Sequence, residues 1–276
     1  MSTVLVLGSA GQVGAYLSNY LSLAGHRVIN FDLATSELED LRIADNPLLL
    51  QAIKRAEFIF FLAFDVGGSS YLEKYQDSFE FISNNMKIMT NTFDCISEFK
   101  KPFVFASSQM SNMSQSAYGL LKAIGEKYTH SLGGRVVKFW NVYGIEKDPQ
   151  KFHVISDFIH MARNVGAIKM RTSGVEKRDF LFADDCCSGL LEIMNRTKDL
   201  ESNEIHLASN SWTSILEIAE IIADYYKVDI YPGKSNDSIQ GGVKNFPSTE
   251  FSKYWSPKTS LKEGIYRIIQ DLESSS

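Results

Sequence analysis

Short, almost wholly apolar runs alternate with longer helix-like segments through the first half of the chain, and this alternation constrains the fold more than any other feature. The apolar runs are Val4–Leu7, Val28–Asp32, Phe58–Phe64, Phe103–Ser107 and Val136–Trp140. The helix-like segments between them are Val13–Leu23, Pro47–Lys54, Phe79–Phe99 and Ser116–Leu132. Strands that are apolar throughout are covered on both faces, and strands separated by helices pair in parallel. The pattern therefore predicts an α/β fold with a doubly wound parallel sheet.

The second half of the chain has shorter elements. Helical patterns occur at Asp157–Asn164, Asp184–Met194, Ser214–Tyr226 and Ser260–Leu272, and short strand-like runs at Ile168–Arg171, Asp179–Phe182, Glu204–Leu207 and Asp229–Tyr231. The Gly-, Ser-, Asn- and Pro-containing stretch Gly233–Pro257 is typical of a long loop. We expect a boundary near Gly144, with a smaller α/β part after it that is partly interleaved with the first.

Composition argues against several classes of function. The 276 residues carry 28 Lys and Arg against 33 Asp and Glu, a net charge of −5, whereas nucleic-acid binding needs a basic surface. No apolar run reaches the roughly 18–20 residues of a membrane span, and the N-terminus lacks the basic region of a signal peptide. The three cysteines (Cys95, Cys186 and Cys187) have neither disulfide nor zinc spacing. We therefore expect a cytoplasmic protein with reduced thiols, no structural metal, no nucleic-acid partner and no membrane association.

A glycine-rich turn, Gly8-Ser9-Ala10-Gly11-Gln12-Val13-Gly14, lies between the first apolar run and the first helix. In this context Gly8 permits a tight turn, Gly11 lets a pyrophosphate approach the backbone, and Gly14 lets the helix pack closely on the strand. The N–H groups at the start of the helix then face the phosphates. The turn predicts a dinucleotide-binding site.

Asp32 ends the second apolar run, where the ribose of a dinucleotide would be held. A carboxylate there accepts hydrogen bonds from both ribose hydroxyls and repels the 2′-phosphate of NADP. The next four residues, 33–36, include no Arg or Lys that would bind such a phosphate. The expected cofactor is therefore NAD.

Tyr118 and Lys122 lie four residues apart on a predicted helix and so share one face. A neighbouring Lys favours the phenolate and lowers the pKa of a Tyr, which can then exchange a hydroxyl proton near neutral pH. The same spacing recurs at Tyr143/Lys147 and Tyr254/Lys258. Only Tyr118 and Lys122 follow a buried run that ends in Ser107-Ser108, at the edge where parallel sheets bind ligands. The candidate catalytic residues are therefore Ser108, Tyr118 and Lys122.

A longer series of motifs occurs in order along nearly the whole chain. It comprises G-S-A-G-Q-V-G at Gly8 to Gly14, Asp32, D-L at Asp40-Leu41, L-A-F at Leu62 to Phe64, N-N at Asn84-Asn85, F-A-S-S at Phe105 to Ser108, Y-G-L-L-K at Tyr118 to Lys122, N-V-Y-G at Asn141 to Gly144, R-D-F-L-F-A-D-D at Arg178 to Asp185 and S-P-K-T-S-L-K-E-G at Ser256 to Gly264. In this order the motifs resemble the extended short-chain dehydrogenase/reductases of the nucleotide-sugar epimerase/dehydratase family. The resemblance implies a Rossmann-type NAD-binding domain at residues 1–144 and a mainly substrate-binding part at residues 145–276.

The resemblance also implies roles for the matching residues. In the proton transfer, Tyr118 would be the acid/base, Ser108 would hydrogen-bond the sugar hydroxyl, and Lys122 would bind the nicotinamide ribose. The cofactor site would comprise Gly8, Gly11, Gln12, Val13, Gly14, Asp32, Asp40, Leu41, Leu62, Ala63, Asn85, Ser107, Tyr118 and Lys122, with Asp40 and Leu41 at the adenine and with Ala63 and Asn85 along the cofactor path. The substrate site would comprise Ser108, Asn141, His153 and Arg178, with Asn141 and Arg178 at the diphosphate.

Two segments resemble the GDP-fucose synthase-like branch of the family. They are Asp65-Val66-Gly67-Gly68 and Phe152-His153-Val154-Ile155. His153 is either an acid or base acting on a keto sugar or a solvent-facing His at a helix start. The resemblance fails after Ser108, where Gln109-Met110 stands in place of the Asp-Glu of 4,6-dehydratases and the Cys of fucose synthase-like enzymes. Because Gln and Met do not exchange protons, 4,6-dehydration is not expected.

The chemistry that the resemblance implies is removal of a hydride and a proton from a sugar hydroxyl, usually at carbon 4. If the hydride returns to the other face of the keto sugar, the protein is an NDP-sugar 4-epimerase, which we expect, with a GDP sugar as one option. If the keto sugar leaves, the protein is a 4-dehydrogenase or, in reverse, a 4-keto-reductase. A non-catalytic dinucleotide-binding sensor is a remote alternative, since such proteins usually lose the Tyr or the Lys.

The segments Phe79–Phe99 and Ser116–Leu132 carry many apolar side chains: Met86, Ile88, Met89, Phe93, Leu120, Leu121 and Ile124. The resemblance implies that two such helices pair with their copies in a four-helix bundle, which predicts a homodimer. The alternative is that these side chains face the chain's own sheet.

Overall fold

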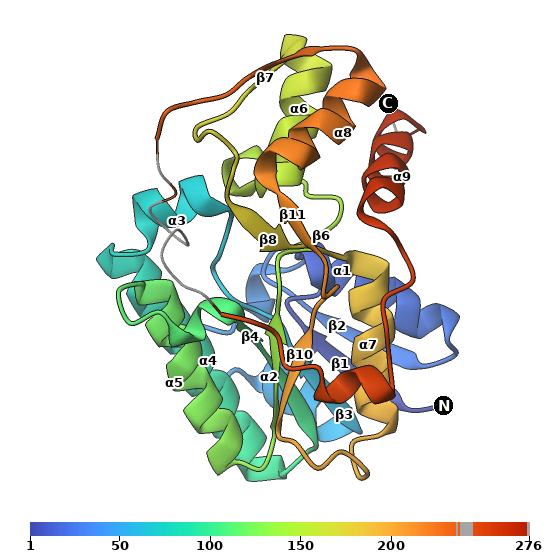
Figure 1. The fold of residues 1–276 in the computed structure, drawn as a ribbon. Helices are drawn as coiled ribbons and strands as arrows, with labels where there is room; N and C mark the ends of the chain where they lie inside the picture. Colours follow the sequence, from blue (N-terminus) through green and yellow to red (C-terminus); the bar gives the residue numbers. More distant parts are fainter. Residues whose placement is uncertain (236, 238–244, 275–276) are drawn as a thin grey trace.

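A six-stranded parallel sheet with the strand order β10-β5-β4-β3-β1-β2 forms the centre of the molecule (Figure 1). The computed structural model describes residues 1–235, 237 and 245–274. The strands are β1 (Thr3–Leu7), β2 (Arg27–Phe31), β3 (Phe58–Phe61), β4 (Phe103–Ser108), β5 (Arg135–Phe139) and β10 (Glu204–Leu207). The doubly wound parallel sheet predicted from the sequence is confirmed.

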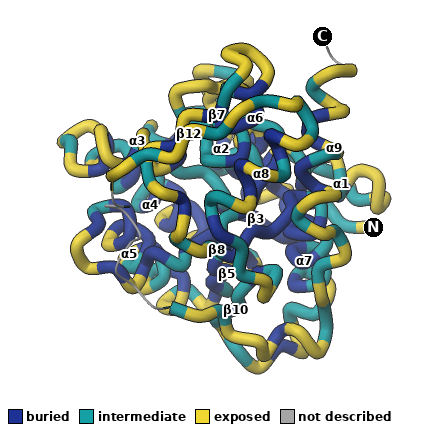
Figure 2. The backbone as a smooth tube through the Cα atoms, turned by 45° about the horizontal axis from the view of Figure 1, so that its top comes forward, coloured by how far each residue is buried: buried dark blue, intermediate teal, exposed yellow. Residues whose placement is uncertain are grey.

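Helices cover both faces of this sheet because successive strand residues point to opposite faces. On one face, Phe61 and Phe105 join a core with helices α2 (Pro47–Arg55), α4 (Phe79–Phe99) and α5 (Ala117–Ser131). On the other face, Phe60 and Val104 join a second core with α1 (Gln12–Leu23) and α7 (Ala183–Asn195). The central strands are therefore buried along their length, as the dark blue tube in Figure 2 shows.

A smaller part, with its own apolar core, lies beyond one end of the sheet. Its helices are α6 (Val154–Val165), α8 (Ile215–Tyr226) and α9 (Leu261–Ser274). Its short strands pair two by two and are β6 (Val142–Tyr143), β7 (Ala167–Lys169), β8 (Lys177–Asp179), β9 (Leu181–Phe182), β11 (Trp212–Ser214) and β12 (Asp229–Tyr231). The remaining elements are α3 (Ser69–Tyr75) and 3₁₀ turns at Glu37–Glu39, Gln109–Asn112, Pro149–Lys151 and Glu250–Lys253.

The two halves of the sequence share the central sheet. Strand β10 pairs with β5, and α7 packs against α1. Residues well beyond Gly144 therefore complete the sheet that residues 1–144 begin.

Several expected boundaries were wrong. Strand β3 ends at Phe61 rather than Phe64, because the chain then bends past Gly8 and runs along the cavity described below. The run Asp179–Phe182 is two strands, since β8 pairs with β11 and β9 pairs with β6. Helix α3 and strands β6 and β11 were not predicted, because they are too short for a clear periodicity. Residues 236 and 238–244 of the expected Gly233–Pro257 loop lie outside the described residues.

The apolar side chains on α4 and α5 divide into two groups. Met89, Phe93 and Leu121 are buried in the chain's own core, so they cannot contribute to a dimer interface. Leu120 and Ile124 on α5 remain 47% and 39% exposed. Only some of the apolar side chains named from the sequence are therefore exposed and available for contact with a second copy of the chain.

All three cysteines are buried thiols without a disulfide. In the described part of the chain, no group of three His, Cys, Asp or Glu side chains is arranged to hold a metal ion. None of its helices combines the length and the apolar character needed to cross a bilayer.

Candidate active site

The carboxyl edge of the sheet borders a cavity of about 1200 Å³. The connection from β1 leads to β2 on one side, whereas the connection from β3 leads to β4 on the other side, which creates a crevice between β1 and β3 at this edge. Every site residue predicted from the sequence lines the cavity except Asn85: Gly8, Gly11, Gln12, Val13, Gly14, Asp32, Asp40, Leu41, Leu62, Ala63, Ser107, Ser108, Tyr118, Lys122, Asn141, His153 and Arg178.

The three glycines of the N-terminal turn meet different demands. Gly8 has a positive φ of 85°, and a Cβ there would lie 2.7 Å from the Ala63 backbone. A Cβ on Gly14 would lie 1.9 Å from the Gly8 carbonyl oxygen, so α1 packs against the turn only with glycine. A Cβ on Gly11 would meet only one atom within 4 Å, at 3.4 Å, so the fold itself does not demand glycine there. Gly11 instead lines the cavity at the start of α1, a cradle that fits the diphosphate of NAD.

Two carboxylates lie together at the end of β2. The Asp32 carboxylate accepts backbone N–H groups of Ala10 and Ala34 at 2.9 and 2.8 Å, which leaves lone pairs for ribose hydroxyls. The backbone N–H of Asp32 donates to Glu39 Oε2 at 2.9 Å, and Glu39 also lines the cavity. Two negative groups at this end fit NAD better than NADP. Glu39 was missed because it belongs to no recognised motif.

Arg42 is a second residue that the sequence analysis missed at this end of the cavity. Its guanidinium binds both carboxylate oxygens of Asp40, with Nε at 2.9 and 3.1 Å, and reaches Asn84 Oδ1 at 3.4 Å. The hydrogen bonds from Arg42 lower the pKa of Asp40. The carboxylate of Asp40 is thus held by Arg42, which also contributes a cation to the wall of the cavity.

Tyr118 and Lys122 lie on one face of α5, as their spacing predicts, and Tyr118 is hydrogen-bonded to the Ser108 hydroxyl. Burial raises the pKa of Tyr118 to about 12, although the hydrogen bond from Ser108 acts in the opposite direction. The pKa of Tyr118 is thus raised in this structure, and not lowered as its spacing from Lys122 led us to expect. The Lys122 ammonium donates to the Ala106 carbonyl at 2.7 Å and lies 5.8 Å from the Tyr118 ring centroid.

Lys122 is itself almost fully buried, with 4% of its surface exposed. Burial lowers its pKa to about 7, and the nearby charge of Glu126 partly offsets this. The ammonium lies 3.7 Å from the ring centroid of Phe64, which packs edge-on against Tyr118 with centroids 5.7 Å apart. Phe64 therefore covers both candidate catalytic side chains. From the sequence, Phe64 was identified only as part of a motif and not as a site residue.

Asn85 lies behind the cavity wall rather than along it. Its side chain is fully buried, accepts the N–H of Asp65 at 2.8 Å, and donates to the carbonyls of Asp65 and Phe81 at 3.1 and 3.0 Å. Asn85 thus holds the segment after β3 in place, and its neighbour Asn84 lines the cavity.

Asn141 and Arg178 both line the cavity but are already engaged. Asn141 has a positive φ of 34° and donates to the Asp179 carbonyl at 2.9 Å. Arg178 forms an ion pair with Asp237, in which both side chains are mostly buried. Asn141 directly precedes β6 and Arg178 lies in β8, shortly before β9, so the parallel β6–β9 pair brings both to one wall.

His153 carries a carboxylate partner that the sequence did not reveal. Its Nδ1 lies 2.6 Å from Glu146 Oε1, and its backbone N–H donates to Oε2 at 2.8 Å. Burial acts to raise the pKa of Glu146, but the hydrogen bonds and charge of His153 outweigh it, and the pKa is lowered overall. The ring of His153 is thus held by an ionised carboxylate while 41% of its side chain stays exposed at the cavity.

A further ion pair crosses the cavity. Lys151 Nζ lies 2.9 Å from Asp65 Oδ1, which also accepts the Tyr71 hydroxyl at 2.7 Å. Asp65 belongs to the segment after β3, whereas Lys151 precedes α6. Polar side chains of the smaller part therefore face the cofactor end of the sheet.

Comparisons with known proteins agree with this geometry. The model of the NAD dependent epimerase/dehydratase family matches residues 4–208. The chain is 26% identical to GDP-mannose 3,5-epimerase 1 of Oryza sativa subsp. indica, over 95% of this chain and 79% of that protein. Epimerase Mth375 of Methanothermobacter thermautotrophicus has the same fold, with a TM-score of 0.84 and 22% identity over 99% and 93% of the chains. UDP-glucose 4-epimerase of Thermotoga maritima shares the fold with a TM-score of 0.81 and 18% identity over 99% of each chain.

The match covers most of the chain, including the glycine turn, both strands that flank the crevice, and Tyr118 with Lys122. The family uses NAD, in agreement with the pair of carboxylates at the end of β2. The chain therefore belongs to the NAD dependent epimerase/dehydratase family, and it is an NAD-dependent enzyme of the extended short-chain dehydrogenase/reductase type.

Proposed function

We propose that the protein is a nucleotide-sugar 4-epimerase that oxidises carbon 4 and then reduces it from the opposite face. The observation that carries the proposal is the hydrogen-bonded pair of Ser108 and Tyr118 at the cavity, with the buried Lys122 beside it. This arrangement can bind a hydroxyl and take up its proton. Identification of the product formed from a nucleotide sugar tests it.

Three residues of this chain would carry out the proton transfer. Ser108 hydrogen-bonds the 4-hydroxyl, Tyr118 takes its proton through that contact, and the Lys122 ammonium stabilises the phenolate that does so. NAD supplies the hydride acceptor, so the carbon–oxygen single bond becomes a carbonyl. Because burial disfavours the Tyr118 phenolate, Ser108 and Lys122 must offset that cost once the substrate is bound.

The binding roles follow the position of each residue along the cavity. We assign the cofactor mainly to residues 1–144 and the substrate mainly to residues 145–276. Gly11 and the start of α1 would hold the NAD diphosphate, and Asp32 the adenine ribose. Asn141 and Arg178 would hold the substrate diphosphate, in which case the substrate displaces Asp237 from Arg178.

A second candidate is epimerisation at the carbons next to a 4-keto group. The observation that favours it is the Glu146–His153 pair, which offers a second acid/base at the cavity. A base there can remove the proton that the keto group acidifies, and the sugar can be reprotonated on the other face. The similarity to GDP-mannose 3,5-epimerase supports this option and a GDP sugar as substrate.

Deuterium labelling separates the two candidates. We expect turnover of UDP-, dTDP- and GDP-hexoses in D₂O to give a 4-epimer without carbon-bound deuterium, because the hydride returns from the cofactor. Deuterium at carbon 3 or 5, measured by NMR, would instead establish the second candidate, and His153→Asn should then abolish the incorporation. Net accumulation of NADH would indicate a 4-dehydrogenase, and NAD binding without turnover of any nucleotide sugar would indicate a sensor.

We also propose that the protein is not a 4,6-dehydratase, although its family includes dehydratases. Gln109 and Met110 follow Ser108 and carry no group that exchanges protons at neutral pH. Elimination of water needs such groups beside carbons 5 and 6. Formation of a 4-keto-6-deoxy sugar in the labelling experiment would contradict this.

Cofactor choice is expected to depend on Asp32. Asp32→Ala should weaken NAD binding and reduce the preference for NAD over NADP. The reason is that one of the two carboxylates near the 2′-position of the ribose is lost while Glu39 remains. Calorimetric titration of both cofactors measures the preference. Asp32→Ala with Glu39→Gln should narrow it further, and equal affinities of the two cofactors for the wild type would contradict the assignment.

We propose that the protein is a homodimer through α4 and α5. Leu120 and Ile124 on α5 are exposed and so remain available for contact with a second copy. Leu120→Glu with Ile124→Glu should convert a dimer of twice 31.0 kDa into a monomer, because charges would replace apolar contacts at the interface. Light scattering measures the mass, Leu38→Glu on another exposed site is the control, and a monomeric wild type at micromolar concentration would contradict the proposal.

A further inference from the structure

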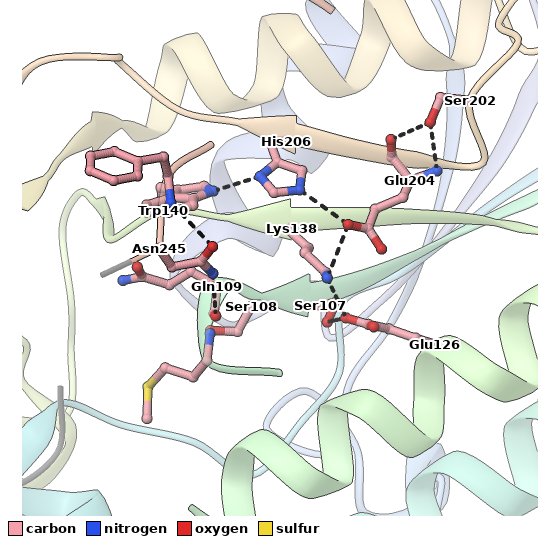
Figure 3. Close-up of polar contacts among 12 residues, drawn as sticks. Ser107, Ser108, Gln109, Glu126, Lys138, Trp140, Ser202, Glu204, His206 and Asn245 are labelled. Atoms are coloured by element: carbon pink, nitrogen blue, oxygen red, sulfur yellow. Dashed lines mark hydrogen bonds and ion pairs between the residues drawn. The ribbon is translucent and has the colours of Figure 1, made fainter. Parts of the chain in front are cut away.

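Behind the wall of the cavity, charged side chains of alternating sign follow one another from α5 across β5 to β10 (Figure 3). Glu126 of α5 lies 3.5 Å from Lys138 Nζ of β5, and Lys138 lies 3.0 Å from Glu204 Oε1 of β10. Glu204 also contacts His206 Nε2 at 3.2 Å. The series ends near the surface, where the Glu204 side chain is 39% exposed.

The inner end of this series is closely enclosed. Glu126 also accepts the Ser107 hydroxyl at 2.5 Å, and its side chain is only 12% exposed. The Lys138 side chain is 4% exposed. The Glu126 carboxylate thus has a cation and a hydroxyl bound to it, and these contacts offset its loss of water.

Glu126 lies one helical turn beyond Lys122 on the same face of α5. Of the described residues, the other groups in contact with Lys122 carry no negative charge. The ammonium meets the Ala106 carbonyl and the rings of Phe64 and Phe105, with Tyr118 on its own helix.

Asp65, next to Phe64, is occupied by Lys151 and Tyr71. Within residues 1–235, 237 and 245–274, no carboxylate forms an ion pair with Lys122. Among the described residues, Glu126 is the negative charge that raises the pKa of Lys122 against the effect of burial, while Lys138 holds the Glu126 carboxylate in place from the other side.

We propose that Glu126 is a positioning residue that keeps Lys122 protonated in its buried site, with Lys138 and Ser107 fixing the Glu126 carboxylate. The inference deepens the proposed function, because the role of Lys122 there depends on its ammonium form. Burial without Glu126 would shift Lys122 toward the neutral amine, in line with the opposing effects of burial and Glu126 on its pKa. The Glu126–Lys138 pair thus does more than attach α5 to the sheet.

Competitive labelling tests the proposal without any catalytic activity. Acetic anhydride acetylates neutral amines only, and Lys122 lines the cavity, so its labelling across pH, resolved by peptide mass spectrometry, reports the midpoint of its titration. In nucleotide-free full-length protein, Glu126→Gln should lower this midpoint by about one unit. Glu126→Asp, which keeps the charge, should restore most of the shift.

Glu204→Gln is the matched control, because it removes the outer carboxylate of the same series and leaves Glu126 with Lys138. It should move the midpoint far less than Glu126→Gln. Glu126→Met is a second neutral variant and carries the test if the Gln variant does not fold. An unchanged Lys122 midpoint in either folded neutral variant overturns the proposal.

Cofactor binding supplies a second readout that separates this proposal from the proposed function. If NAD binding needs the ammonium, Glu126→Gln should bind NAD about tenfold more weakly than wild type at pH 8 and nearly equally at pH 5.5. A purely structural role would weaken binding equally at both pH values and would overturn the proposal. Failure to turn over any nucleotide sugar would contradict the proposed function but leave both measurements valid.

Discussion

Tyr118→Phe is expected to slow hydride transfer from the sugar to NAD by about 10²–10⁴-fold, the usual cost of losing one general acid/base. The substitution keeps the ring that packs against Phe64 and removes only the hydroxyl bonded to Ser108. NAD affinity should survive, because the glycine turn and Asp32 hold the other end of the cofactor. Single-turnover absorbance at 340 nm with a panel of nucleotide sugars measures the rate.

The chain offers a matched control for this experiment. Tyr254 and Lys258 have the same four-residue spacing, but neither lines the cavity. Tyr254→Phe should leave the rate of NAD reduction unchanged. If Tyr118→Phe reduced NAD as fast as the wild type with the same sugar, Tyr118 would be a packing residue and His153 the first candidate for the proton acceptor.

Lys122→Met is expected to abolish sugar oxidation and, in the NAD-free protein at pH 6, to increase the free energy of unfolding by about 2–4 kcal/mol. The folded protein holds Lys122 with a pKa of about 7, well below that of an exposed Lys, so burying the ammonium opposes folding. This free-energy cost of burying the ammonium is fully present below about pH 7, where Lys122 is protonated in both the folded and the unfolded state. The cost diminishes as the pH rises toward the pKa of Lys122 in the unfolded chain, above which the side chain is neutral in both states.

Urea unfolding of wild type and variant between pH 6 and pH 10 measures the effect. The stability difference should be largest at pH 6 and should shrink with rising pH, although the Ala106 carbonyl loses its donor at every pH. Lys54→Met, at an exposed lysine of α2, should give no such pH-dependent difference. A variant less stable than wild type at pH 6 would contradict the expected cost of burying Lys122.

The two predictions together describe a site in which function opposes stability. Lys122 and Tyr118 are both buried against Phe64, which disfavours the charged form of each. A site that must form an ammonium and a phenolate in such surroundings depends on the charges placed around it. Glu126, bound to Lys138 on the next strand, is the charge that this fold provides.

Local features of the sequence determined the central sheet, the glycine turn and the NAD preference. The apolar runs that form β1, β3 and β4 are buried on both faces, so burial is encoded in each residue of the run. Gly14 is required by a contact within a seven-residue turn, Gly8 by its positive φ in that turn, and Asp32 by its place at a strand end. Such features depend on neighbours in the sequence, so they can be predicted without knowing the rest of the fold.

Only the tertiary structure decided which charges meet in the cavity and how they titrate. The spacing of Tyr118 and Lys122 was predicted, but the direction of the Tyr118 pKa was not, because desolvation depends on packing by Phe64 and on where the ammonium points. Glu146 beside His153, Glu39 beside Asp32 and Lys138 beside Glu126 are pairs whose partners no motif links. The partners in each pair are close in the sequence, but they meet only because the turns between them fold back at the sheet, and a side chain's charge state is set by that shared environment rather than by its own segment.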